Sequence, residues 1–398
     1  MADQPTSGGG SQPSKPPPWN DPAVRSIVFQ VLALVVLGWF FWTILNNTLA
    51  NMETRGISTG FAFLDRDAGF GILMSLIPYD ESNSYGRTFV VGLLNTVLVA
   101  FLGIILATVL GFIIGVARLS NNWVIAKLAA VYVEVVRNIP LLLQIFFWYI
   151  AVLQALPGIR QSITFGDSFY LNNRGFFFPK PVFGDGFGLV WIALIVAIVA
   201  IVCLRKWAKR QLDRTGQQFP VFYASAGLII GLPLIAFLAM GAPLTFEYAE
   251  LQRFRLAGGA SVIPELMALL WALTMYTAAF IAEIVRAGIL AVSHGQTEAS
   301  RALGLKNNQT LQLVIIPQAM RVIIPPLTSQ YLNLTKNSSL ATAIGYPDLV
   351  SVFMGTTLNQ TGQAVEIVAM TMAVYLSISL LISLVMNIYN RRMALVER

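Results

Sequence analysis

Eight long apolar segments run through the chain and constrain its fold more than any other feature. A transmembrane helix needs about 17–25 mostly apolar residues, and the segments that supply them are Ile27–Leu45, Phe89–Ala117, Ile139–Leu156, Phe187–Leu204, Phe219–Phe246, Leu266–Ala282, Leu311–Leu334 and Ile367–Asn390. Only 11% of the 398 residues are charged, against about 25% in a soluble domain. The sequence therefore predicts an all-α polytopic membrane protein with about eight transmembrane helices in a lipid bilayer.

The rare residues exclude several classes of function. The chain has one cysteine, Cys203, and one histidine, His294, so we expect no disulfide framework, no metal site and no Ser-His triad. It lacks the Gly-x-x-x-x-Gly-Lys-Ser/Thr sequence that cradles ATP phosphates, and we expect no cofactor in this chain. The net charge of +7 is scattered between apolar segments, which does not favour a nucleic-acid partner.

The basic residues also predict the topology. The run Arg205-Lys206-Trp207-Ala208-Lys209-Arg210 fills a short connection, and short basic connections stay in the cytoplasm. This orientation puts both termini in the cytoplasm, with loop 205–218 inside and loop 157–186 outside. Residues 1–26, rich in Pro and Gly, are expected to form a disordered tail.

A polar segment between the sixth and seventh apolar segments has the most specific pattern. Ala299, Ala302 and Leu303 follow a helical spacing in it, so one short helix can offer a stripe of small residues to a partner. Thr297 is expected to cap its start, and Gly304 to end it in a left-handed conformation.

This segment resembles the cytoplasmic coupling loop of ABC importer permeases. The resemblance lies in Gly295, in Glu298-Ala299-Ser300, in Gly304 after three intervening residues and, after nine more residues, in Val314-Ile315-Ile316-Pro317. The chain departs from the usual Glu-Ala-Ala at Ser300, a small residue that should still fit. Within that family, the polar amino acid branch is similar at these further places: Glu134–Gln144, Ala282–Ile289, Gln318–Arg321 and Pro325-Pro326.

The resemblance implies a type I permease core of five helices, enlarged by an extra N-terminal helix and an extra hairpin. Enlarged chains of this kind resemble one permease subunit of the bacterial general L-amino acid importers. The expected organisation is a tail (1–26), the extra helix with an outer loop (27–88), the N-terminal portion of the permease core (89–156), inserted loops with a hairpin (157–261), the C-terminal portion of the permease core (262–390, coupling loop 293–317) and a tail (391–398).

The family also implies the location and the partners. We expect a multi-pass protein of the bacterial inner membrane that imports L-amino acids of broad specificity by alternating access. The expected partners are a dimer of an ABC ATPase, which binds the ATP and Mg, a second permease, expected to be a different homologous chain, and a periplasmic amino acid-binding protein.

The expected substrate site is a polar island, residues 335–339, which follows the seventh apolar segment. An amino acid zwitterion needs donors for its carboxylate and acceptors for its ammonium, and unwound backbone is tolerated where it lines a cavity. Lys336 can pair with the carboxylate, Asn337 can accept from the ammonium, and Ser338 and Ser339 can cap a new half-helix. The family resemblance places substrate contacts in the same stretch. The alternative is that Lys336 extends to the lipid headgroups.

Several charged or polar residues near the helix ends have a structural and a functional interpretation. Gln144 either reaches the substrate pathway or bonds between helices. Arg321 is expected to pair with a carboxylate of a neighbouring subunit. Glu283 with Arg286, and Glu134 with Arg137, have the i, i+3 spacing of structural or gating ion pairs.

Two other functions are kept as alternatives. An ion-coupled secondary transporter of small polar solutes needs intramembrane acids or histidines as relays, and the apolar segments contain almost none. A membrane anchor for another enzyme would leave the coupling loop and the polar island without a purpose. A permease should co-purify with an ATPase and a second permease, whereas a secondary transporter should not.

Overall fold

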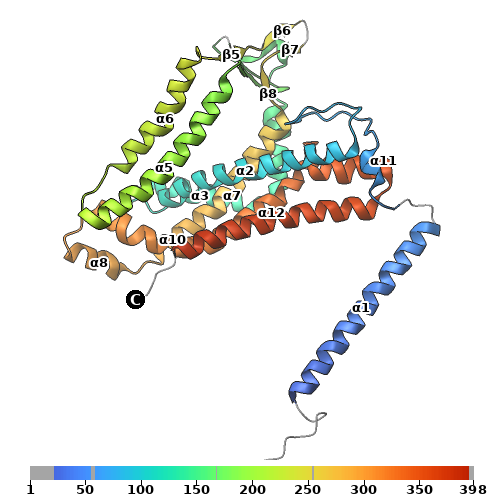
Figure 1. The fold of residues 1–398 in the computed structure, drawn as a ribbon, viewed down its shortest axis with the longest axis horizontal. Helices are drawn as coiled ribbons and strands as arrows, with labels where there is room; N and C mark the ends of the chain where they lie inside the picture. The colour runs from blue at the N-terminus through green and yellow to red at the C-terminus, as the bar shows by residue number, and fades with distance from the viewer. Residues whose placement is uncertain (1–21, 55–58, 167, 253–254, 394–398) are drawn as a thin grey trace, which may run out of the picture.

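The structure is a computed structural model that describes residues 22–54, 59–166, 168–252 and 255–393. Long helices dominate it (Figure 1). The α-helices are α1 (Pro22–Thr54), α2 (Tyr85–Ala117), α3 (Trp123–Asn138), α4 (Leu141–Phe146), α5 (Phe187–Thr215), α6 (Val221–Ala239), α7 (Pro264–Leu290), α8 (His294–Ala302), α9 (Asn307–Thr310), α10 (Ile316–Asn337), α11 (Leu358–Thr361) and α12 (Ala364–Met393). The predicted C-terminal tail lies outside the described residues from 394 on, as does the N-terminal tail up to residue 21.

Short 3-10 and π segments interrupt or extend these helices. The 3-10 segments are Ala62–Asp65, Ile159–Gln161 and Ser338–Ile344, and the π segments are Phe147–Leu153, Leu311–Ile315 and Val350–Thr357. One π segment ends at Ile315, two residues before Pro317, and α10 continues through Pro325 and Pro326. The irregular backbone therefore lies just before α10, between its prolines and α8.

The expectation of about eight membrane-spanning helices is confirmed. Seven described helices are long and apolar enough to cross a membrane, or up to eight if a bent pair counts as one span. The bent pair is α3 with Leu141–Leu153, at 106°. The third predicted span, Ile139–Leu156, is therefore only one limb of a broken span, because Ile139 is extended and Pro140 precedes α4.

Helix α5 is longer than predicted. It runs to Thr215, so most of the connection predicted at 205–218 is helical. Its 29 residues give a length of about 43 Å, whereas the hydrocarbon core is about 30 Å thick. The basic end of α5 therefore extends beyond the apolar region of the hairpin that it forms with α6.

Eight short strands, which the sequence did not predict, form a β cap at one end of α5, α6 and α7 (Figure 1). They are β1 (Ile163–Phe165), β2 (Phe169–Asn172), β3 (Gly175–Phe178), β4 (Lys180–Phe183), β5 (Leu244–Glu247), β6 (Glu250–Gln252), β7 (Arg255–Ala257) and β8 (Ala260–Val262). An antiparallel sheet has the order β1-β2-β3-β8, and β4-β5 and β6-β7 form separate pairs. The sheet thus connects the inserted loop to the start of α7.

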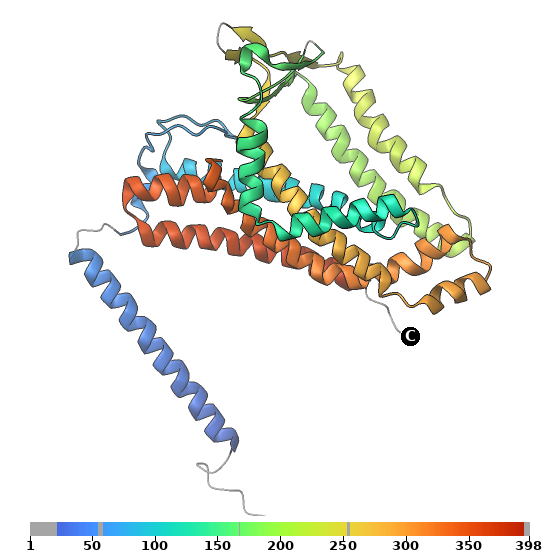
Figure 2. The same ribbon diagram turned by 180° about the vertical axis from the view of Figure 1, so that it is seen from behind.

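The core lies where α2 packs against α7. Gly111 and Gly115 of α2 face Ile281 and Val285 so closely that an added Cβ would lie 2.6 and 2.7 Å from those side chains. Small residues allow such close approach of helices in membranes. Around this pair lie α10 and α12, whereas α1 stands apart and α5 packs mainly against α6 (Figures 1 and 2).

Candidate functional site

The segment predicted to couple the permease to an ATPase forms helix α8, which begins earlier than expected. Its N-cap is Ser293, not Thr297, and Ser293 makes no side-chain cap hydrogen bond. The helix ends at Ala302, and Gly304 follows with φ +77°, as predicted. The Gly304 N–H donates to the Arg301 carbonyl and the Leu305 N–H to the Ser300 carbonyl, which satisfies carbonyls of the last turn.

The predicted coupling residues of α8 lie on its exposed surface. Gly295, Glu298, Ala299, Ala302, Leu303 and Gly304 are all exposed, and Leu303 has 81% of its surface accessible. Ser300 is buried and its hydroxyl donates to the Gln296 carbonyl. His294 Nδ1 lies 3.0 Å from Glu298 Oε1. The helix therefore buries Ser300, accepts a hydrogen bond from Gln318 Nε2 at Gln296 Oε1, and leaves the small residues and Leu303 uncovered by the described residues of the chain.

The predicted ion pair between Glu283 and Arg286 is present, with 2.6 Å between Oε1 and Nη2. The sequence did not reveal a third member. Arg118, the C-cap of α2, donates from Nη1 to Glu283 Oε2. The Glu283 carboxylate therefore joins the ends of α2 and α7 and is shared by two guanidinium groups.

The second predicted pair, Glu134 with Arg137, is wrong. It is absent from the ion pairs within 4 Å in the described stretches of the chain. Both residues are exposed on α3, and the Arg137 guanidinium lies 4.9 Å from the centroid of the Phe280 ring. A cation over an aromatic face is itself attractive, so Arg137 packs on α7 instead of pairing along α3.

Arg321 and Gln144 both bond to backbone carbonyls. Arg321 Nε donates to the Met393 carbonyl at 2.8 Å, at the end of α12, where a cation is favourable. Gln144 is buried, and its Nε2 donates to the Val136 and Ile139 carbonyls at 2.9 and 3.0 Å. Gln144 therefore bonds across the break between α3 and α4, which is the structural one of its two interpretations.

The polar island is not unwound, contrary to prediction. Lys336 and Asn337 end α10, and Ser338–Ile344 continues as a 3-10 helix. Instead of capping a new half-helix, the Ser338 and Ser339 hydroxyls donate to the Thr335 and Lys336 carbonyls, both at 2.8 Å. Lys336 is exposed, Asn337 and Ser339 are half-buried and Ser338 is buried. The four residues are contiguous, but they form a helical polar surface and not a cavity of free N–H groups.

A buried carboxylate that the sequence analysis missed lies close to this surface in the chain. Asp348 is 1% exposed and accepts from the Ser351 N–H at 2.8 Å and from the Thr342 and Tyr375 hydroxyls at 3.4 Å. The signal was the sequence Tyr346-Pro347-Asp348 before an apolar segment, since Asp favours helix starts. Asp348 thereby ties the 3-10 segment to α12.

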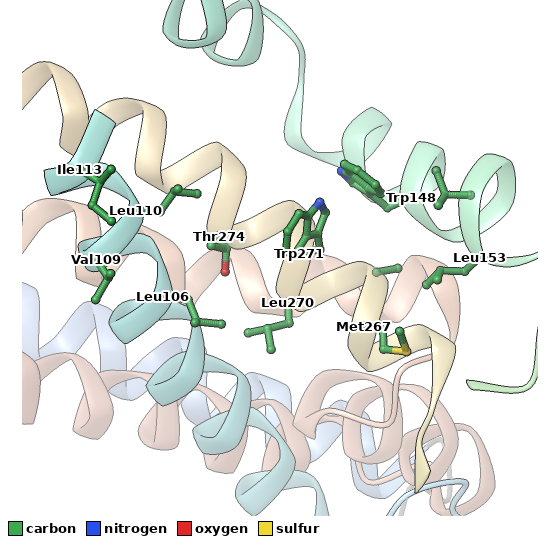
Figure 3. Close-up of a pocket in the computed structure, with 12 residues that line it drawn as sticks. Leu106, Val109, Leu110, Ile113, Trp148, Leu153, Met267, Leu270, Trp271 and Thr274 are labelled. Atoms are coloured by element: carbon green, nitrogen blue, oxygen red, sulfur yellow. The ribbon is translucent and has the colours of Figure 1, made fainter. Parts of the chain in front are cut away.

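A cavity of about 520 Å³ opens between α2, the π segment Phe147–Leu153 and α7 (Figure 3). Trp148 and Trp271 meet edge to face there, with ring centroids 5.7 Å apart. The other residues that line it are aliphatic, except for Met267 and the hydroxyl-bearing Thr274. Because no charged group of the described residues lines this cavity, it offers no ion pair to a zwitterion.

The chain matches known permeases along almost its whole length. A family model described as binding-protein-dependent transport system inner membrane component matches residues 215–395. The putative amino-acid ABC transporter permease protein YhdX of Escherichia coli (strain K12) is 58% identical, over 95% of this chain and 96% of that protein. The general L-amino acid transport system permease protein AapQ of Rhizobium johnstonii is 54% identical, over 95% and 94%.

The name of a third relative specifies a narrower set of substrates. The glutamate/glutamine/aspartate/asparagine transport system permease protein BztB of Rhodobacter capsulatus is 43% identical, over 95% of this chain and 96% of that protein. All three relatives are permeases of amino acid transport systems, and the described chain has the membrane helices that such a protein needs. The chain therefore belongs to the family of amino-acid ABC transporter permeases.

Proposed function

We propose that this permease is one subunit of an ATP-driven importer that carries L-amino acids of broad specificity into the cytoplasm by alternating access. The observation that carries the proposal is the exposed surface of α8 and of Leu303 and the left-handed Gly304 that follow it. An exposed Leu303 beside Ala299 and Ala302 gives a partner a small apolar contact surface. The ATPase dimer, which would bind ATP and Mg, is the proposed occupant.

The proposed orientation puts α8 and both termini in the cytoplasm of a bacterial cell, with the chain in the inner membrane. Supporting it, the basic end of α5 and helix α8 lie at the same end of the molecule, opposite the β cap (Figures 1 and 2). Lys and Arg near membrane helices favour the cytoplasmic side. In this orientation the β cap faces the periplasm, where a soluble amino acid-binding protein would deliver substrate.

The proposed substrate surface is the helical polar segment Lys336–Ser339. Lys336 is exposed and would meet the substrate carboxylate, while the half-buried Asn337 would accept from the ammonium. Broad specificity is supported by the similarity to AapQ, a permease of general L-amino acid transport, and by a neutral side chain at Asn337. A second, homologous permease would complete the pathway across the membrane.

Purification from native membranes tests the assembly. A permease of this kind is expected to bring down an ATPase, a second permease and an amino acid-binding protein, and the reconstituted complex should take up amino acids only with ATP. Uptake that needs an ion gradient instead of ATP, by a chain purified without an ATPase, would support a secondary transporter and contradict the proposal.

A further inference from the structure

A polar cavity of about 460 Å³ lies at the end of α7 that adjoins the β cap. Its lining includes Arg174 from the turn between β2 and β3, Tyr149 and Gln154 from the π segment and its end, Glu265 from α7 and Leu73 from the loop before α2. It is a different place from Lys336–Ser339. The cavity combines a cation, an acid and neutral polar groups, unlike the apolar cavity of Figure 3.

The backbone of Arg174 is held in a tight turn. Asn172 pairs with Gly175 across the hairpin, and Asn173 and Arg174 form its two-residue loop. The buried Asn172 accepts from the Arg174 N–H at 2.8 Å. Gly175 has φ +129°, and an added Cβ would lie 2.3 Å from the Val262 carbonyl, so only glycine fits there.

The acidic residue, Glu265, lies three residues after the strand that pairs with this hairpin. Phe176 of β3 pairs with Val262 of β8, and α7 begins two residues later at Pro264. Glu265 lies in the first turn of α7, where a carboxylate is favourable. The sheet therefore fixes Arg174 and Glu265 on one scaffold, although they are far apart in the sequence.

The two charges share the cavity without neutralising each other. Arg174 and Glu265 do not form an ion pair within 4 Å, as judged from the pairs found in the described residues. Glu265 Oε1 instead accepts from the Tyr149 hydroxyl at 2.9 Å. The Glu265 carboxylate is thus positioned by Tyr149, the exposed Arg174 extends from a fixed backbone, and both charges have bonding capacity left for a molecule in the cavity.

We propose that this cavity binds the α-ammonium and α-carboxylate of an amino acid on its way from the binding protein to the membrane pathway. The Arg174 guanidinium pairs with the carboxylate in the bidentate manner that arginine favours, and the Glu265 carboxylate accepts from the ammonium. The amino acid's own side chain points to the open side near Leu73, which is 74% exposed. Recognition is therefore confined to the groups that all amino acids share.

The inference rests on the proposed importer function and orientation, but it can be tested without transport. A single cysteine is placed by Leu73→Cys in a Cys203→Ser chain, and the purified permease complex in nanodiscs is labelled with a polar maleimide in the absence of binding protein. L-leucine, L-glutamate and L-arginine are expected to slow labelling with similar half-effective concentrations. 4-Methylpentanoate, which lacks the ammonium, and 3-methylbutylamine, which lacks the carboxylate, should be at least about ten-fold weaker.

Variants assign the effect to the two charges. Arg174→Gln and Glu265→Gln should each raise the half-effective concentration about ten-fold or more. Lys180→Gln removes a cation of the same cap that does not line the cavity, and it should change nothing. Because Arg174 is exposed, its variant should fold and keeps the test decisive if Glu265→Gln lowers the yield.

Three outcomes overturn the inference: no protection by any amino acid, equal protection by 4-methylpentanoate, or protection unaffected in Arg174→Gln. ATP-driven uptake by the Cys203→Ser chain, which keeps Leu73, with binding protein separates the two proposals. Uptake without protection removes this outer site and leaves the importer standing, whereas protection without uptake counts against the importer alone.

Discussion

Arg118 at the end of α2 donates to Glu283 near the end of α7, a contact between residues 165 positions apart. Arg286 shares the same carboxylate from one turn further along α7. Both arginines hydrogen-bond to the carboxylate, but Arg286 pairs within one helix, where such a pair contributes about 0.2–0.5 kcal/mol. Arg118 joins two helices and is less exposed, and a hydrogen bond to a charged group there contributes about 1.5–3 kcal/mol. We expect Arg118→Met to lower the Tm of the purified complex more than Arg286→Met, and Arg118→Met added to Glu283→Gln to cost little more. Equal losses from the two arginine variants would show that the contact between helices has no special weight.

Gly304 should be replaceable only by a residue that tolerates a left-handed backbone. No atom lies within 4 Å of a Cβ added there, so the cost of Gly304→Leu is conformational, about 1–2 kcal/mol. We expect Gly304→Leu to insert normally and to lose ATP-driven uptake, because the end of α8 is displaced. Gly304→Asn is the matched control, since asparagine accepts this conformation, and it should retain most uptake. Loss of uptake in both variants would mean that position 304 tolerates no side chain, whatever its backbone preference.

Glu298 should matter through its charge on the exposed face of α8. Glu298→Lys reverses that charge, and it also replaces the contact with His294 by one that is repulsive when the imidazole is protonated. We expect the stimulation of ATPase activity by substrate-loaded binding protein to be lost in Glu298→Lys and largely kept in Glu298→Gln. If reversal leaves the stimulation unchanged, Glu298 lies outside the contact with the ATPase.

The topology can be tested at two exposed positions. Asn173 in the β2–β3 turn and Gln217 after α5 are both exposed, whereas Asn172 is buried and Gln211, within α5, is half-buried. In a Cys203→Ser chain, an impermeant maleimide added outside intact cells is expected to label Asn173→Cys and to miss Gln217→Cys. The opposite pattern would invert the proposed orientation, α8 included.

Lys336 and Asn337 should affect transport in different ways. Lys336→Ala removes a cation for the substrate carboxylate, which should raise the apparent KM roughly ten- to a hundred-fold. Lys336→Arg keeps the charge and serves as the control. Asn337→Asp should instead shift preference toward arginine by Coulomb attraction. An unshifted order of arginine, leucine and glutamate in competition uptake with Asn337→Asp would remove this segment as the substrate site.

The sequence predicted the membrane helices well because lipid imposes a strong rule. Each spanning segment must satisfy its own backbone, so long apolar segments such as Phe89–Ala117 could only be helices, and α2 spans Tyr85–Ala117. Gly304 was predictable for a similar reason, since few residues accept its conformation. The start of α8 was missed because Ser293 and Thr297 are both good N-cap residues, and the sequence does not show which of them caps the helix.

Other features could not be read from local patterns. The run Thr335–Ser339 looked like a break, but serine hydroxyls can bond to carbonyls of the preceding turn and remain helical, as Ser338 does. The strands of the β cap have three or four residues each, too few to show an alternating pattern. Arg118 contacts Glu283 only because α2 packs on α7. That packing depends on glycines of α2, and the sequence does not show which helix they face.

Helix α7 connects the β cap to α8 and contains no internal proline. Strand β8 leads into its first turn, and its last turn precedes α8 by a few residues. Its 27 residues make a rod of about 40 Å. If this rod pivots near one end, a tilt of about 5° moves the other end by about 3.5 Å. A small rotation forced on α8 by an ATPase would thus be amplified into a displacement of Glu265 comparable with the length of a hydrogen bond, and α7 would act as a mechanical lever between the two faces of the membrane.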